Sequence, residues 1–297
     1  MSDKKKGVMN AAVAYVMWGL YPLYWWQLQR VAPAEILINR MIWSFVTLFL
    51  IIVIFKWSDL LRRTIKDLLS DRKRIIFLLL ATVLISINWF TYTWSVVSGR
   101  VLEAGLGYYI SPILSFIIGA FILKEKFNKL QVLAACIATS GVLFQTISYG
   151  IVPWISLILA STFAFYGLCK KLIKVDPFMS LFLETTLMLP FASFFFGRLI
   201  VGGESTFLIG DGMSILLLIG AGIITVSPLF FFGKATQLAP LKLVGFMQYI
   251  GPTIGLFIAI FIFREPFSTT RLITFAIIWL ACIVFTISQF NTNSTLK

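Results

Sequence analysis

The chain has 297 residues, of which 59% are hydrophobic and only 12% are charged, and its formal net charge is +13. A soluble domain carries about 25% charged residues, so this composition excludes an ordinary water-soluble protein and indicates a chain that is solvated mostly by lipid. Surplus Lys and Arg are typical of the cytoplasmic loops of membrane proteins, and we therefore expect no nucleic-acid partner.

Long apolar segments recur from one end of the chain to the other. About 20 such residues cross the hydrocarbon core of a bilayer, and ten segments of this kind predict an all-α integral membrane protein with ten transmembrane helices. The predicted spans are 8–26, 33–55, 75–98, 103–123, 128–147, 150–169, 177–196, 212–233, 242–263 and 271–290.

Basic residues are distributed unequally between the two sides that these spans define. The side that holds both termini carries nineteen Lys and Arg residues, including Lys170, whereas the other side carries five and Arg40 lies inside a span. Because Lys and Arg accumulate in cytoplasmic loops, this bias predicts that both termini are cytoplasmic.

One motif occurs twice, 140 positions apart. Residues 109–112 (Tyr-Ile-Ser-Pro) and 124–127 (Lys-Glu-Lys-Phe) match residues 249–252 (Tyr-Ile-Gly-Pro) and 264–267 (Arg-Glu-Pro-Phe). A proline inside a helix removes a backbone hydrogen bond, so we hypothesise that the helices of Pro112 and Pro252 bend and act as hinges. The repetition indicates a duplicated domain.

The duplication divides the chain into residues 1–148 and 149–297, each with five predicted helices. Because five is an odd number, the second repeat starts on the opposite side of the membrane from the first. The two repeats are thus predicted to be inverted. Inverted repeats are a common architecture of secondary transporters, with the substrate site near the midplane between the halves.

Two charged residues lie inside predicted spans at matching positions. Arg40 is seven residues beyond Pro33, and Glu184 is seven residues beyond Pro177. Charges at such depths are costly and usually face a cavity or a partner, so both are candidates for lining the substrate path. The alternative is that each reaches its nearer interface or caps a helix end. Their depths disfavour a direct ion pair, and Glu184 is the candidate carboxylate for proton coupling.

Aromatic and amide side chains suggest the wall of a binding cavity. An apolar aromatic wall with a few polar groups suits a small amphiphile, although Trp and Tyr also collect at membrane interfaces. Trp18 and Tyr166 occupy equivalent positions in the two repeats and are candidates to face one another. The candidate substrate-binding residues are Trp18, Arg40, Asn88, Trp89, Tyr92, Tyr108, Tyr166, Glu184, Gln248 and Tyr249.

The remaining carboxylates near span ends have structural interpretations. Glu103 opens a predicted helix, where the helix dipole favours a negative charge. Glu125 and Glu265 close predicted helices beside basic residues, and pairing of these residues across the halves is the alternative to a plain boundary role. Glu35 lies near an interface, and we expect it to be structural.

Signatures of catalysis and metal binding are missing from the sequence. It has no histidine, no Gly-x-x-x-x-Gly-Lys-Ser/Thr loop, no His-Glu-x-x-His and no Gly-x-Ser-x-Gly. The three cysteines show no paired spacing. We therefore expect no catalytic residues, no metal and no cofactor.

Several stretches resemble the drug/metabolite transporter superfamily, in its EamA-type branch and the RarD group within it. The resemblance covers nearly the whole chain and implies ten helices, inverted halves, a bacterial inner-membrane location and export of small molecules. The matching stretches are residues 15–19, 40–44, 88–89, 102–104, 107–108, 163–168, 245–246 and 251–253.

Together these features predict a secondary transporter that exports small amphiphilic metabolites or drugs by alternating access. One alternative is a facilitator of the same fold that only equilibrates its substrate. The other is a membrane enzyme or assembly factor, against which the repeat and the missing catalytic motifs argue. The identity of the substrate and the oligomeric state have no signature in the sequence.

Overall fold

The described chain of the computed structural model, residues 2–98, 100–150, 153–264 and 269–294, is built of helices. Within these ranges, nine helices are long and apolar enough to span a membrane. A further long helix, α1 (Asp3–Trp25), lies outside that set because its Tyr, Trp, Asn and Pro residues lower its hydropathy. The prediction of an all-α integral membrane protein is confirmed.

All ten predicted spans fall on helices, although the ninth span is divided. Two short segments, the 3-10 helix Trp26–Leu28 and the π-helix Ile258–Ile262, extend α1 and α12. The other helices are α2 (Pro33–Ile54), α3 (Ser58–Leu69), α4 (Arg72–Val97), α5 (Val101–Phe121), α6 (Lys129–Tyr149), α7 (Trp154–Ile173), α8 (Pro177–Val201), α9 (Thr206–Ile209), α10 (Gly212–Leu238), α11 (Leu241–Met247), α12 (Ile250–Phe257) and α13 (Thr269–Ser294).

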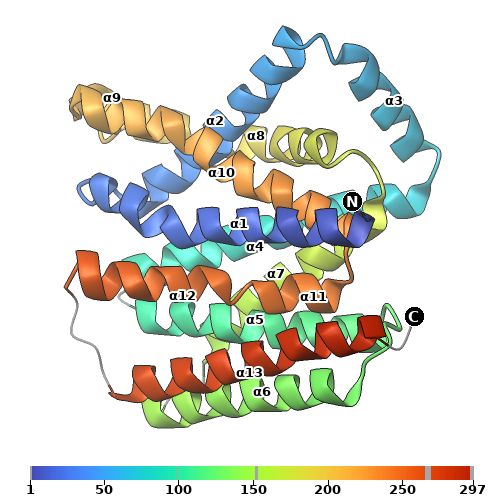
Figure 1. The fold of residues 1–297 in the computed structure, drawn as a ribbon. Coiled ribbons are helices and arrows are strands. Elements are labelled where there is room, and N and C mark those ends of the chain that lie inside the picture. The colour runs from blue at the N-terminus through green and yellow to red at the C-terminus, as the bar shows by residue number, and fades with distance from the viewer. Residues whose placement is uncertain (1, 99, 151–152, 265–268, 295–297) are drawn as a thin grey trace.

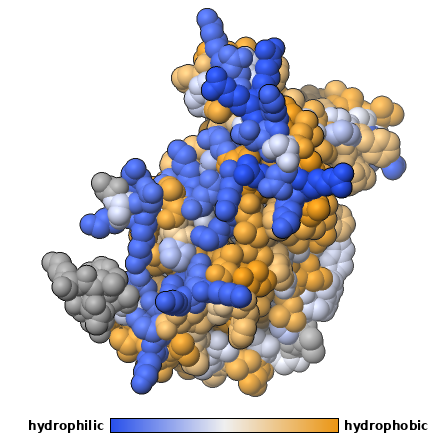
Figure 2. Space-filling view, turned by 90° about the vertical axis from the view of Figure 1, so that its right-hand side faces the viewer, coloured by the Kyte–Doolittle hydropathy of each residue, from blue (hydrophilic) through white to orange (hydrophobic). Residues whose placement is uncertain are grey.

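Figure 1 shows most of the long helices running side by side, with α3 crossing them at one end of the bundle. α1 begins and α13 ends at this same end, where the Lys4 ammonium donates a hydrogen bond to Gln289 Oε1 at 3.2 Å. Figure 2 views this end and shows hydrophilic side chains gathered over it. We call it the terminal end of the bundle.

The two copies of the repeated motif differ in their helices. α5 runs unbroken through Pro112, whereas the helix of the second copy is interrupted between α11 and α12, just before Pro252. A proline at position 252 cannot donate to the carbonyl of Gln248, which instead accepts from Gly251 N at 3.2 Å. Both helices were expected to bend at their prolines, and the structure interrupts only the second.

The turns that follow the two motif helices are alike. Lys124 and Arg264, which correspond in the repeat, both have a left-handed backbone, with φ of 51° and 53°. The Glu125 carboxylate accepts hydrogen bonds from the backbone N–H groups of Leu241 at 2.6 Å and Lys242 at 3.1 Å. These N–H groups begin α11 and have no partner within the helix. Glu125 therefore joins the first half of the chain to the second, and Glu265 lies outside the described residues.

A glycine allows α2 and α10 to approach closely. A Cβ atom added at Gly222 on α10 would lie only 2.2 Å from the backbone oxygen of Trp43 on α2. No side chain fits at that distance, so this crossing requires glycine. It holds Arg40 of α2 beside Thr225 of α10, which is the starting point of the candidate site.

Candidate substrate-binding site

Arg40 lies about two turns into α2, in the half of the bundle away from the terminal end. Its guanidinium stacks over Trp25 of α1 at 5.2 Å and over Trp89 of α4 at 4.8 Å from the ring centroids. Its Nε donates a hydrogen bond to Thr225 Oγ1 of α10 at 3.1 Å. Cation–π contacts of this kind stabilise a desolvated cation, so four helices combine to hold one positive charge in place.

Three tyrosines complete the surroundings of Arg40. Tyr21, Tyr92 and Tyr108 are close enough to interact with it electrostatically, and the rings of Tyr92 and Tyr108 meet edge to face at 6.4 Å. Tyr108 is nevertheless 46% exposed, and Arg40 itself is only half-buried. We call Tyr21, Trp25, Arg40, Trp89, Tyr92, Tyr108 and Thr225 the Arg40 site.

A proline in α10 explains the position of Tyr21. Pro228 has no N–H, so the carbonyl of Ile224, four residues earlier, lacks its helical partner. The Tyr21 hydroxyl donates a hydrogen bond to that carbonyl. The bond fixes the Tyr21 ring beside Arg40 and links α1 to α10 at the level of the site.

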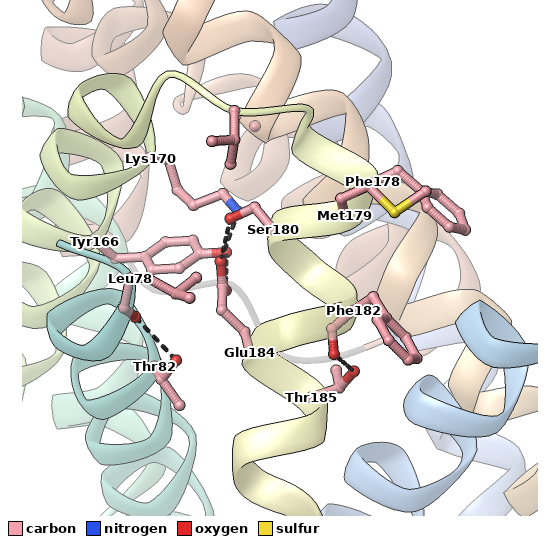
Figure 3. Close-up of polar contacts among 12 residues, drawn as sticks. Leu78, Thr82, Tyr166, Lys170, Phe178, Met179, Ser180, Phe182, Glu184 and Thr185 are labelled. Atoms are coloured by element: carbon pink, nitrogen blue, oxygen red, sulfur yellow. Dashed lines mark hydrogen bonds and ion pairs between the residues drawn. The ribbon is translucent and has the colours of Figure 1, made fainter. Parts of the chain in front are cut away.

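A second polar cluster lies toward the terminal end, between α7 and α8. The Lys170 ammonium is 2.6 Å from Glu184 Oε1 and donates to Ser180 Oγ at 2.7 Å. Ser180 also donates to Glu184 at 2.8 Å, and the Tyr166 hydroxyl donates to Glu184 Oε2 at 3.1 Å. Figure 3 shows these side chains converging on the carboxylate. We call these four residues the Lys170–Glu184 cluster.

The placement of Lys170 differs from its assignment to the basic loops. Its side chain is fully buried at 0% exposure, and that of Glu184 is exposed by 2%. Tyr166 and Lys170 are four residues apart and share a helix face, but this spacing does not identify Glu184 as their partner. Among the described residues Arg40 and Glu184 form no ion pair with one another, as their depths led us to expect.

Aromatic rings fill the space next to the Lys170–Glu184 cluster. The ring of Phe232 on α10 stacks on Tyr166 at 5.9 Å and packs against Trp18 of α1 at 5.7 Å. Phe163 contacts Trp18 and Phe232 at 5.6 and 5.1 Å. Trp18 and Tyr166 are therefore joined through Phe232 and Phe163. We call Trp18, Phe163, Tyr166 and Phe232 the aromatic cluster.

The other predicted site residues make packing contacts outside the Arg40 site. Asn88 of α4 donates to the carbonyl of Leu159 at 2.8 Å and to Thr162 Oγ1 at 2.9 Å, both on α7. Gln248 accepts a hydrogen bond from Ser111 at 3.2 Å. Tyr249, which is buried, donates to the carbonyl of Tyr109 at 3.1 Å. The last two contacts hold α5 against the junction of α11 and α12.

Glu35 and Glu103 have their own partners. Glu35, exposed by 2%, accepts from Thr206 N at 2.7 Å, Thr206 Oγ1 at 2.6 Å and Ser205 Oγ at 3.0 Å. It thereby ties the start of α9 to α2. Glu103 pairs with Arg100 at 2.7 Å at the start of α5. Both arrangements are structural contacts, and neither carboxylate bonds to Arg40.

Two open surface grooves lie elsewhere on the molecule. One, of about 450 Å³, is bordered by Lys6, Pro177 and Lys234 at the terminal end, and the other, of about 350 Å³, by Trp26 and Phe263. No candidate residue lines either groove. In the described part of the chain, no group of three or more Cys, Asp or Glu side chains is arranged to hold a metal ion.

Comparisons with known proteins place the chain in a family. Residues 5–147 match the EamA-like transporter family. The transporter YojE of Bacillus subtilis is 42% identical over 97% of this chain and 96% of that protein. Protein RarD of Escherichia coli is 38% identical over 97% of this chain and 96% of its own length. A solved structure with 16% identity matches with a TM-score of 0.73 over 96% of this chain and 99% of that one, which supports the fold. The chain therefore belongs to the EamA-like transporter family, in its RarD-like branch, and is a multi-pass membrane transporter.

Proposed function

We propose that this transporter is a secondary exporter of small amphiphilic metabolites or drugs that works by alternating access in the bacterial inner membrane, with both termini in the cytoplasm. The observation that carries the proposal is the separation of two polar sites along the bundle. The Arg40 site and the Lys170–Glu184 cluster lie in opposite halves, and the aromatic cluster packs beside the latter. The excess of Lys and Arg on the side of both termini, where Figure 2 shows a hydrophilic surface, supports the cytoplasmic placement of that end.

Residues 1–148 and 149–297 act as inverted repeats in this proposal. Helix packing supports the division. In the repeat, α1 corresponds to α7 and α4 corresponds to α10. The packing of α1 on α10 is therefore equivalent to the packing of α7 on α4, and both contacts are present. α2 packs on α8, α5 on α11 and α6 on α13, and each of these pairs joins equivalent helices. Rocking of one repeat against the other is the motion that such an architecture provides.

The aromatic cluster serves as the barrier on the cytoplasmic side. Tyr166 is fully buried and Phe232 is exposed by only 2%, whereas Tyr108 in the Arg40 site is exposed by 46%. The rings beside the Lys170–Glu184 cluster are thus buried more completely than Tyr108, which supports a barrier on that side. Substrate from the cytoplasm has to displace these rings before it reaches Arg40.

Proteoliposomes loaded with a panel of aromatic and aliphatic small molecules test the transport proposal. Efflux is followed with and without an imposed pH gradient. Accumulation against a concentration gradient while protons flow supports a coupled exporter with a proton as the coupling ion. Flux that runs only downhill favours the facilitator, and no flux for any compound contradicts the proposal.

The barrier has a test of its own in Phe232→Ala. Phe232 packs against both Trp18 and Tyr166, so removing its ring loosens the cluster and we expect downhill flux to rise several-fold. Phe90→Ala is the matched control, because Phe90 on α4 is 62% exposed and lies outside the aromatic cluster. Equal flux through both variants contradicts the assignment of the barrier.

A further inference from the structure

We propose that the Arg40 site binds the anionic group of the substrate, so that the substrate class is an organic monoanion with a flat aromatic or apolar body. The inference rests on the proposed transport function, because it assigns the ligand chemistry of the transport site. It follows from three features of the described residues: an uncompensated cation, a stacked aromatic wall and two unused phenol groups.

The positive charge of Arg40 has no acidic partner in the described chain. The carboxylates that share this membrane region are bonded elsewhere: Glu35 to Ser205 and Thr206, and Glu103 to Arg100 through Oε1. Glu184 is paired with Lys170. A charge in the middle of a membrane-spanning helix is costly, so a site that keeps one unpaired is suited to an incoming anion.

The donors of Arg40 are only partly used. Nε bonds to Thr225, and among the described residues neither terminal nitrogen of the guanidinium has a hydrogen-bond partner. Those two nitrogens form the planar fork that binds a carboxylate through two parallel hydrogen bonds. Arg40 is only half-buried, so part of its side chain remains accessible.

The surrounding rings select the rest of the ligand. Trp25 and Trp89 flank the guanidinium, and Tyr92 and Tyr108 contact each other edge to face nearby. Within the described chain, neither of these two tyrosine hydroxyls bonds to another protein group, so both are free to donate to an anion. Flat apolar walls favour an organic anion over a hydrated inorganic one.

Calorimetric titration of the purified protein in nanodiscs tests the inference with a matched pair of ligands. 2-Naphthoate and 2-naphthamide have nearly the same shape and differ in charge. We expect the carboxylate to bind about 10- to 100-fold more tightly, the range given by one charge-assisted hydrogen-bonding interaction. Equal affinities, tighter binding of the amide, or no binding of the carboxylate overturns the inference on the unaltered protein.

Two variants test whether Arg40 causes the preference for 2-naphthoate over 2-naphthamide. Arg40→Gln is expected to remove the difference between the two ligands, whereas Arg100→Gln should retain it. Arg100 is the matched control, because it lies at the same end of the bundle but is already paired with Glu103 and stacked over Trp154 at 5.1 Å. An undiminished preference in Arg40→Gln overturns the assignment, as does its loss in Arg100→Gln.

Binding and transport can fail separately in this design. If the panel of compounds is transported but 2-naphthoate does not bind, the anion site is wrong and the transport proposal stands. If 2-naphthoate binds with the expected preference but no compound crosses the membrane, the site is supported and the transport proposal fails. The variants are compared only if each elutes as a single folded species. If Arg40→Gln does not fold, the affinities of the two ligands for the unaltered protein decide whether the inference holds.

Discussion

The Lys170–Glu184 pair should be among the most costly interactions in the molecule to break from one side. Its two charged atoms are 2.6 Å apart and its side chains are exposed by 0% and 2%. Glu184→Gln keeps the shape of the side chain but removes its charge, so the Lys170 ammonium is left buried without a counter-charge. Breaking a buried pair in this way costs about 3–5 kcal/mol of unfolding free energy.

The measurement is reversible unfolding in mixed micelles, followed by tryptophan fluorescence, for Glu184→Gln and for the double variant Lys170→Met/Glu184→Gln. Because the double variant leaves no uncompensated charge, we expect it to recover at least half of the loss. Asp59→Asn is the control. Its partner Arg62 is 3.9 Å away and both side chains are more than 80% exposed, at 82% and 81%, so the change should stay below about 1 kcal/mol. A loss below about 1 kcal/mol for Glu184→Gln refutes the reasoning.

Three further changes probe stability by the same measurement. Gly222→Ala places a Cβ atom 2.2 Å from the Trp43 oxygen and should lower the free energy of unfolding by about 3 kcal/mol. Gly197→Ala is the control, because the space around Gly197 is open, and it should cost nothing. Similar values for both variants contradict the close approach of α2 and α10. Tyr21→Phe leaves the carbonyl freed by the proline of α10 without its donor and should cost about 1–3 kcal/mol, and a neutral result argues against that bond. Glu35→Gln weakens the attachment of α9 and should cost about 1.5–3 kcal/mol, which an unchanged stability would contradict.

The sequence predicted the helices well because the bilayer imposes a length on them. Each predicted span falls on helix in the structure, and the start of α2 at Pro33 and of α8 at Pro177 coincides with the predicted start. Proline is favoured at the first helical position, which gives these boundaries a local signal. The division of the ninth span lies just before Pro252, where a proline signals a bend. Pro112 carries the same signal but leaves α5 unbroken, so the sequence did not tell the two helices apart.

The partners of the membrane-embedded charges were harder to predict. Glu184 is bonded to a residue fourteen positions earlier, and Arg40 to one 185 positions later. Such contacts depend on which helices are neighbours, and the hydropathy pattern does not encode that. Lys170 was assigned to a loop because it lies near the end of a predicted span, where basic residues are normally found.

Arg40 and Glu184 occupy matching positions in the two repeats, yet their surroundings assign them different tasks. Glu184 is neutralised by Lys170 in a buried cluster, so that half of the bundle carries no net charge from the pair. In the described part of the chain, Arg40 is stabilised by two indole faces and one hydroxyl, and it keeps part of its surface accessible. Two cation–π contacts contribute about 1–4 kcal/mol together, comparable with the cost of the embedded charge. The site is therefore stable enough to exist empty, and the monoanion that we propose as its ligand would bring its net charge to zero.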